Sequence, residues 1–198
     1  MNAVVSENYE EALSQIDALI EGSDYFVSIE RLPGVTVDPT YAERLEKSGG
    51  RLSESSDDKE KSEIAADMAE IWYSIGNRYY YRNQEAFGLL IIRSYLQSIV
   101  LCQLSIQFHD NARAHRQFGI TLANLGTSES SIVREFNSTI SLDPKDGYSL
   151  CKLGNAHSNA KDYPRAIEYL KQAIAVDPTV EKAYINLANN YGFDGKKG

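Results

Sequence analysis

The chain has 198 residues, of which 42% are hydrophobic, so it is long enough and apolar enough to bury a core. Its formal net charge is -8, from 20 lysines and arginines against 28 aspartates and glutamates. This balance argues against nucleic acid and against an anionic membrane as partners, since both need clustered basic side chains. Basic or neutral segments of other proteins are the partners that the charge favours.

The first predicted element is an amphipathic helix. Residues 7–22 read ENYEEALSQIDALIEG and place Ala12, Ile16 and Leu19 on one side of a helix. The start of the chain, MNAVVSENYEE, holds no basic region and no long apolar run. We therefore expect no secretory signal and a cytoplasmic location.

Loop and linker signals follow this helix. Residues 25–39 are β-branched and aromatic and contain Pro33-Gly34, which favours an extended piece or an ordered loop. The sequence SGGRLSESSDD at residues 48–58 is the clearest linker of the chain. These signals predict an N-terminal extension of helix, loop and linker over residues 1–57, and a helical domain over residues 58–198.

Helical periodicity with short connections continues from residue 58 to the end of the chain. The expected helices, including two in the extension, span residues 7–21, 40–47, 58–82, 86–108, 111–125, 129–141, 146–160, 163–175 and 180–191. Asp162 is the expected cap of the helix at 163–175, with Pro164 in its first turn.

The helix expected at 86–108 contains the most apolar stretch, GLLIIRSYLQSIVLCQLSIQF at residues 88–108. Polar residues such as Arg93 and Gln97 interrupt it, so it lacks the run of about 18 apolar residues that a membrane span needs. Apolar residues lie nearly all round this helix, which indicates burial. Either an N-terminal segment or another chain is expected to cover its outer side.

A repeat pattern is clearest between residues 147 and 180. Leu153, Leu170 and Ala173 form an apolar stripe with helical spacing, and Gly154 and Ala166 allow two antiparallel helices to approach closely. Its full set of pattern residues is Leu150, Leu153, Gly154, His157, Ala166, Leu170, Ala173 and Pro178. The stretch resembles the tetratricopeptide repeat, whose signature is W-x2-L-G-x2-Y, A-x3-F and P on a 34-residue period.

Partial copies of this signature occur on both sides. Asp143-Pro144 lies 34 residues before Asp177-Pro178. First-helix matches are Trp72, Ile75, Gly76 and Tyr79; Phe118, Gly119 and Leu122; and Tyr184, Leu187, Ala188 and Tyr191. The resemblance covers roughly residues 58–198, with a fourth unit that reaches Gly195 before its second helix. It implies an all-α fold, a right-handed α-solenoid of about three and a half helical hairpins after the N-terminal helical extension.

The resemblance also implies a binding groove, because first helices of the family line a concave face. Positions directly after the Leu-Gly pair hold Asn77, Asn155 and Asn189, with Ile120 as the exception, and positions directly before it hold Ser74, Gln117, Lys152 and Asn186. An amide carries a donor and an acceptor and can pair with the backbone of a bound peptide. The alternative is that asparagine is simply tolerated on a polar helix face.

Family members that bind the C-terminal carboxylate of heat-shock chaperones use a clamp of two lysines, two asparagines and one arginine. Asn155 and Asn186 match the two asparagines, but Cys151 and Tyr73 replace the first lysine, and Tyr148 stands where another belongs. Aromatic contacts to an apolar or mixed peptide are expected instead. The expected groove residues are Tyr73, Asn77, Gln117, Tyr148, Lys152, Asn155, Asn186 and Asn189, and Tyr80 is a further aromatic candidate.

Catalytic and metal-binding patterns are missing from the sequence. The three histidines, His109, His115 and His157, form no HExxH motif, and no Cys-x2-Cys, GxSxG or GxGxxG occurs. Cys102 and Cys151 are interpreted as buried thiols in a reducing compartment. We therefore expect no catalytic residue, no metal, no cofactor and no enzymatic activity.

The predicted function is that of a non-enzymatic interaction module, which holds a peptide or helix of a partner protein in the groove. One alternative is a small cytosolic chaperone for a secreted or assembling partner. Another is a regulatory fragment of a larger enzyme. A third is a homo-oligomer that associates through the apolar helix at 88–108.

Overall fold

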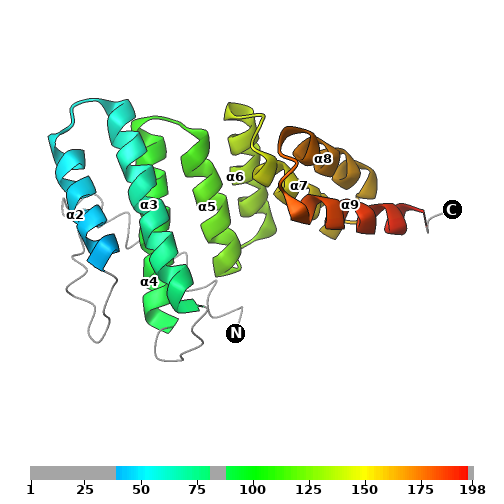
Figure 1. Ribbon diagram of the computed structural model, residues 1–198, viewed down its shortest axis with the longest axis horizontal. Coiled ribbons are helices and arrows are strands. Elements are labelled where there is room, and N and C mark those ends of the chain that lie inside the picture. Colours follow the sequence, from blue (N-terminus) through cyan, green and yellow to red (C-terminus); the bar gives the residue numbers. More distant parts are fainter. Residues whose placement is uncertain (1–38, 81–87, 196–198) are drawn as a thin grey trace. The chain divides into compact units, whose positions relative to one another are not determined.

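A computed structural model describes residues 39–80 and 88–195 of the protein, and its regular elements in these ranges are all α-helices (Figure 1). They are α2 (Pro39–Glu54), α3 (Asp58–Tyr80), α4 (Gly88–Phe108), α5 (Ala112–Leu125), α6 (Glu129–Leu142), α7 (Gly147–Asn159), α8 (Tyr163–Val176) and α9 (Glu181–Asp194). The predicted all-α helical-repeat fold is confirmed for these residues. The helix expected at 7–21 and most of the loop at 25–39 lie outside them.

The helices belong to two compact units, each with its own packing. Unit 1 comprises residues 1–110 and 121–127, and unit 2 comprises residues 111–120 and 128–198. Helix α5 is therefore divided between the units. The prediction of an extension over 1–57 and a repeat domain over 58–198 remains a prediction.

The core of unit 1 is the hairpin of α3 and α4, which have 23 and 21 residues. Its helices pack closely because small and polar side chains alternate with apolar ones along the contact. Ser62 Oγ lies 3.1 Å from Ser105 Oγ, and Ser105 Oγ donates to the Ser62 carbonyl at 2.7 Å. Gly76 lies under the Tyr95 ring, where an added Cβ would come within 2.7 Å of Tyr95 Cε1.

Helix α4 is largely buried, as the sequence analysis predicted for residues 88–108. Tyr95, Ile99 and Cys102 are at most 2% exposed, whereas Ile92 is 37% exposed. The predicted cover of its outer side, and self-association through this helix, remain predictions. In the described part of the chain, no helix is both long enough and apolar enough to cross a membrane.

The linker predicted at residues 48–58 is wrong, because α2 continues to Glu54 and only residues 55–57 separate it from α3. The buried residues Leu45, Gly49 and Leu52 lie on one face of α2, which packs on α3. Two consecutive glycines cost the helix about 1 kcal/mol each. Burial of Leu45 and Leu52 against α3 contributes about 1.5–3 kcal/mol per side chain, so tertiary packing outweighs this cost.

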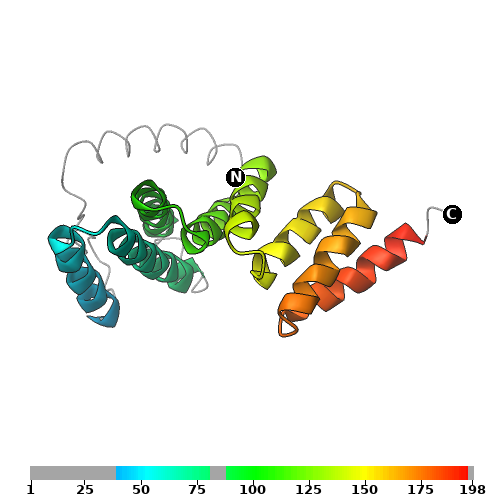
Figure 2. The ribbon, with the colours of Figure 1, turned by 90° about the horizontal axis from the view of Figure 1, so that it is seen from above.

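Unit 2 contains the hairpin of α7 and α8, with α9 packed against α8 (Figure 2). The predicted cap of α8 is confirmed: the Asp162 carboxylate accepts a hydrogen bond from the Arg165 backbone N–H, and Pro164 lies in the first turn. Asp146 caps α7 in the same way, 2.7 Å from the Ser149 nitrogen. These caps set where each helix starts and hence which side chains face the core.

The core of this hairpin uses the residues that the repeat pattern singled out. Leu150 is 3% exposed, Leu170 and Ala173 are fully buried, and Ala183 of α9 completes the cluster. A Cβ added to Gly154 would lie 2.7 Å from Leu170 Cγ and 3.2 Å from the Ala166 carbonyl oxygen. Gly154 is thus a point of close approach between α7 and α8.

Candidate functional site

Three predicted groove residues share one face of α7, because Tyr148, Lys152 and Asn155 are spaced four and three residues apart. The Lys152 ammonium lies 5.2 Å from the centre of the Tyr148 ring, in a cation–π contact. The Tyr148 ring in turn meets the edge of Phe136 on α6, with the ring centres 6.2 Å apart. Phe136 therefore supports one part of the Tyr148 ring, and the rest of this side chain is exposed to solvent.

A fourth predicted residue, on α9, lies next to this face. Helix α9 is the first helix of the following repeat unit. Asn186 Nδ2 on α9 donates a hydrogen bond to Asn155 Oδ1 on α7 at 2.6 Å. The backbone carbonyl of Asn186 accepts a hydrogen bond from Nδ2 of the buried Asn190 at 2.8 Å. We call Tyr148, Lys152, Asn155 and Asn186 the amide face.

The amide face is polar and carries little charge. Burial raises the pKa of the Tyr148 phenol, so its hydroxyl stays protonated at neutral pH. Lys152 is the one basic residue among these four. Within the described residues, Asn155 Nδ2 makes no hydrogen bond, so it can donate to an incoming carbonyl oxygen.

Of the four remaining predicted groove residues, two lie in unit 2 and two in unit 1. In unit 2, Asn189 is exposed on α9, whereas Gln117 on α5 is only 7% exposed and packs into the core. Tyr73 and Asn77 belong to unit 1, where Tyr73 stacks on Tyr95 and its hydroxyl accepts a hydrogen bond from Asn124 Nδ2 at 2.9 Å. The Tyr80 side chain lies outside the described structure.

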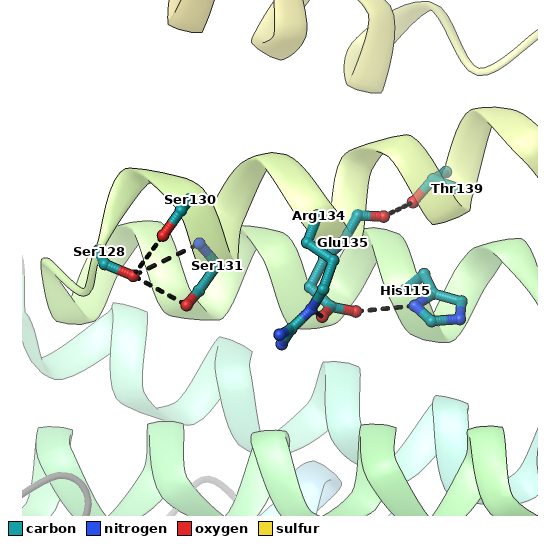
Figure 3. A network of polar contacts seen from close by, with 7 residues as sticks. All are labelled: His115, Ser128, Ser130, Ser131, Arg134, Glu135 and Thr139. Carbon is teal, nitrogen blue, oxygen red and sulfur yellow. Dashed lines mark hydrogen bonds and ion pairs between the residues drawn. The ribbon is translucent and has the colours of Figure 1, made fainter.

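A polar cluster around the buried carboxylate of Glu135 in unit 2 was missed by sequence reasoning (Figure 3). Glu135 of α6 is 4% exposed, and its carboxylate contacts His115 Nδ1 of α5 at 2.8 Å and Arg134 Nε at 3.0 Å. Figure 3 shows the His115 and Arg134 side chains meeting the same carboxylate from different helices. Twenty residues separate His115 from Glu135, so no spacing rule points to the pair. The cluster holds α5 to α6 by satisfying a buried carboxylate.

Both cysteines are buried thiols, as predicted, with Cys102 fully buried and Cys151 only 4% exposed. Burial raises the pKa of the Cys151 thiol, while the nearby Lys152 ammonium and a hydrogen bond from Asn186 act in the opposite direction. A raised pKa lowers the fraction of reactive thiolate at neutral pH.

We expect the native protein to react slowly with an aromatic disulfide reagent, and the urea-unfolded protein to titrate both thiols rapidly. The measurement is the absorbance of the released thiolate over time. Rapid labelling of Cys151 in native protein, located by mass spectrometry of peptides, would contradict its burial and show that α7 opens.

Known proteins resemble this chain at two levels. Residues 147–180 match the family model described as tetratricopeptide repeat. Two crystal structures of MamA align with TM-scores of 0.50: one is 15% identical, covering 79% of this chain and 82% of MamA, and the other 14%, covering 81% and 87%. The Arabidopsis OM64 TPR domain aligns with a TM-score of 0.48 at 13% identity, covering 64% of this chain and 96% of that domain. No curated protein matches the sequence.

Proposed function

Since residues 147–180 are a tetratricopeptide repeat within a chain of that helical-repeat fold, we propose that the protein is a non-enzymatic module that binds a peptide or helix of a partner protein. Repeats of this kind generally serve protein–protein interaction rather than catalysis. We further propose that the amide face is the contact surface and that the protein works in the cytoplasm.

The observation that carries the proposal is the Asn155–Asn186 hydrogen bond, which joins the first helices of two successive repeat units. The bond fixes the orientation of both amides, so less side-chain entropy is lost when a ligand binds. Asn155 Nδ2 then offers a donor to a backbone carbonyl, which is a contact independent of the ligand's sequence.

Tyr148 and Lys152 supply the selective part of the proposed contact. The Tyr148 ring, held by Phe136 and contacted by the Lys152 ammonium, fits an apolar ligand side chain, and the ammonium fits a ligand carbonyl or carboxylate. The ligand favoured by this chemistry is a mixed polar and aromatic peptide rather than a phosphate backbone.

The double variant Asn155→Ala with Asn186→Ala tests the proposal. Loss of two amide hydrogen bonds is expected to weaken binding by about 1–3 kcal/mol. Ligands are selected from displayed random peptides on the wild-type protein, and their affinities are measured by titration calorimetry. Thermal unfolding of the same proteins, followed by circular dichroism, is expected to change little.

A matched control replaces two exposed amides of unit 2, Asn137→Ala with Gln172→Ala, and should bind as the wild type does. Equal binding by the double variant would show that the amide face is not the contact surface. A large fall in melting temperature of the double variant would show instead that the two asparagines are structural.

A further inference from the structure

A second lysine, Lys182 of α9, lies next to the amide face. Helices α7 and α9 meet where Asn186 Nδ2 donates to Asn155 Oδ1, across a separation of 31 residues. The same separation relates Cys151, one turn before Asn155 on α7, to Lys182, one turn before Asn186 on α9. Lys182 is therefore on the side of α9 that meets α7.

The buried Cys151 thiol is close to two positive charges. Burial raises the pKa of this thiol, while the ammoniums of Lys152 and Lys182 each act to lower it. The effect of a charge falls with distance and with screening by solvent, so both ammoniums lie near the same sulfur. The amide face is thus bordered by a pair of cations, one from each first helix.

Neither cation is neutralised by a carboxylate among the described residues. Lys152 contacts the Tyr148 ring, and neither it nor Lys182 forms an ion pair within that part of the chain. The nearby carboxylate of Asp146 is paired with Arg116 at 3.1 Å and also caps α7. In a chain with a net charge of -8, two such cations make a local patch of opposite sign, which favours an anionic group in the ligand.

We propose that Lys152 and Lys182 bind the side-chain carboxylate of an aspartate or glutamate within the partner peptide, an inference that rests on the amide face being the contact surface. Along α7, Lys152 stands between Tyr148 and Asn155, so ligand contacts flank the carboxylate on both sides. A C-terminal carboxylate would end the ligand at Lys152 and leave one of the two flanking contacts empty. The acidic residue is therefore an internal one.

The spacing of the contacts along α7 sets the spacing of residues in the ligand. Tyr148 and Lys152 are one helical turn apart, which is about 6 Å along the helix axis. An extended peptide places every second side chain on the same side, at intervals of about 6.6 Å. A ligand extended along α7 should therefore carry an apolar or aromatic residue two positions from its acidic residue.

The peptides selected from a displayed random library on the wild-type protein should be enriched in this pair of residues. The tightest of them is synthesised with an amidated C-terminus in two forms, one acidic and one with the acidic residue replaced by its amide. Titration calorimetry on the wild type should show about fivefold tighter binding of the acidic form, since a partly exposed ion pair is a modest interaction. Lys182→Met should remove most of this difference, whereas Lys171→Met on α8 lowers the charge equally and should keep it.

Four results would each overturn the carboxylate site. They are selected peptides without an acidic residue, equal binding of the two forms to the wild type, a difference that persists in Lys182→Met, and loss of binding when the C-terminus is amidated. The first two are measured on the wild type, so a variant that folds poorly does not decide the outcome. The proposed function fails by a different result, namely equal binding of peptides by the wild type and by Asn155→Ala with Asn186→Ala.

Discussion

Replacing Phe136 with alanine is expected to lower the free energy of unfolding of unit 2 by about 3–5 kcal/mol, the largest effect of any single change considered. Phe136 is 1% exposed, lies over Gly119 of α5 and meets the Tyr148 ring of α7. Its removal leaves a cavity where three helices meet, and close-packed neighbours relax into such a cavity only in part.

Urea unfolding followed by circular dichroism measures this loss. Leu142→Ala on the same helix is the matched control, because Leu142 is 45% exposed and should change stability by less than about 0.5 kcal/mol. Since Phe136 also supports Tyr148, the Phe136→Ala protein should bind peptides at the amide face more weakly, even under conditions in which it is folded. Equal losses in both variants would contradict the packing described for α6.

The second large effect is expected from Gly154→Ala, which should destabilise unit 2 by about 1–3 kcal/mol through overpacking. Helix propensity alone predicts the opposite sign, since alanine is favoured over glycine by about 1 kcal/mol inside a helix. The added methyl would lie 2.7 Å from Leu170 Cγ and 3.2 Å from the Ala166 carbonyl oxygen, so α7 and α8 must move apart.

Gly192→Ala in α9 separates these two contributions. A Cβ at Gly192 meets no atom within 4 Å, so this variant should be neutral or slightly stabilised in the same urea experiment. Opposite signs for the two glycines are the expected result. Stabilisation of both would mean that the α7–α8 approach at Gly154 is looser than described, so that the helix propensity of alanine outweighs any overpacking there.

The repeat at 147–180 was predictable because its pattern residues each perform a local packing task. Gly154, Ala166 and Leu170 are buried together as their spacing indicated, and Asp162 caps α8. The full length of helix α2 was not predictable in the same way. Its two glycines indicated a linker, and the helix continues through them because Leu45 and Leu52 are buried where α2 packs on α3.

The candidate site shows the same division. Periodicity placed Tyr148, Lys152 and Asn155 on one helix face, because residues three and four positions apart share a face in any α-helix. The hydrogen bond between Asn155 and Asn186 and the burial of Gln117 depend on how neighbouring helices pack. The Glu135 cluster with His115 likewise needs two helices in contact, so spacing along the chain carries no sign of it.

The sequence by itself determined that the described part of this chain is helical, that residues 147–180 are a hairpin of two close-packed helices, and where these two helices begin and end within a few residues. These properties follow from turn residues, caps and apolar periodicity, which act over one or two helical turns. Only the tertiary structure decided which polar side chains face one another and that Gln117 is buried. Those outcomes depend on contacts between different helices. The caps and the apolar periodicity of one helix are the same whichever contacts form.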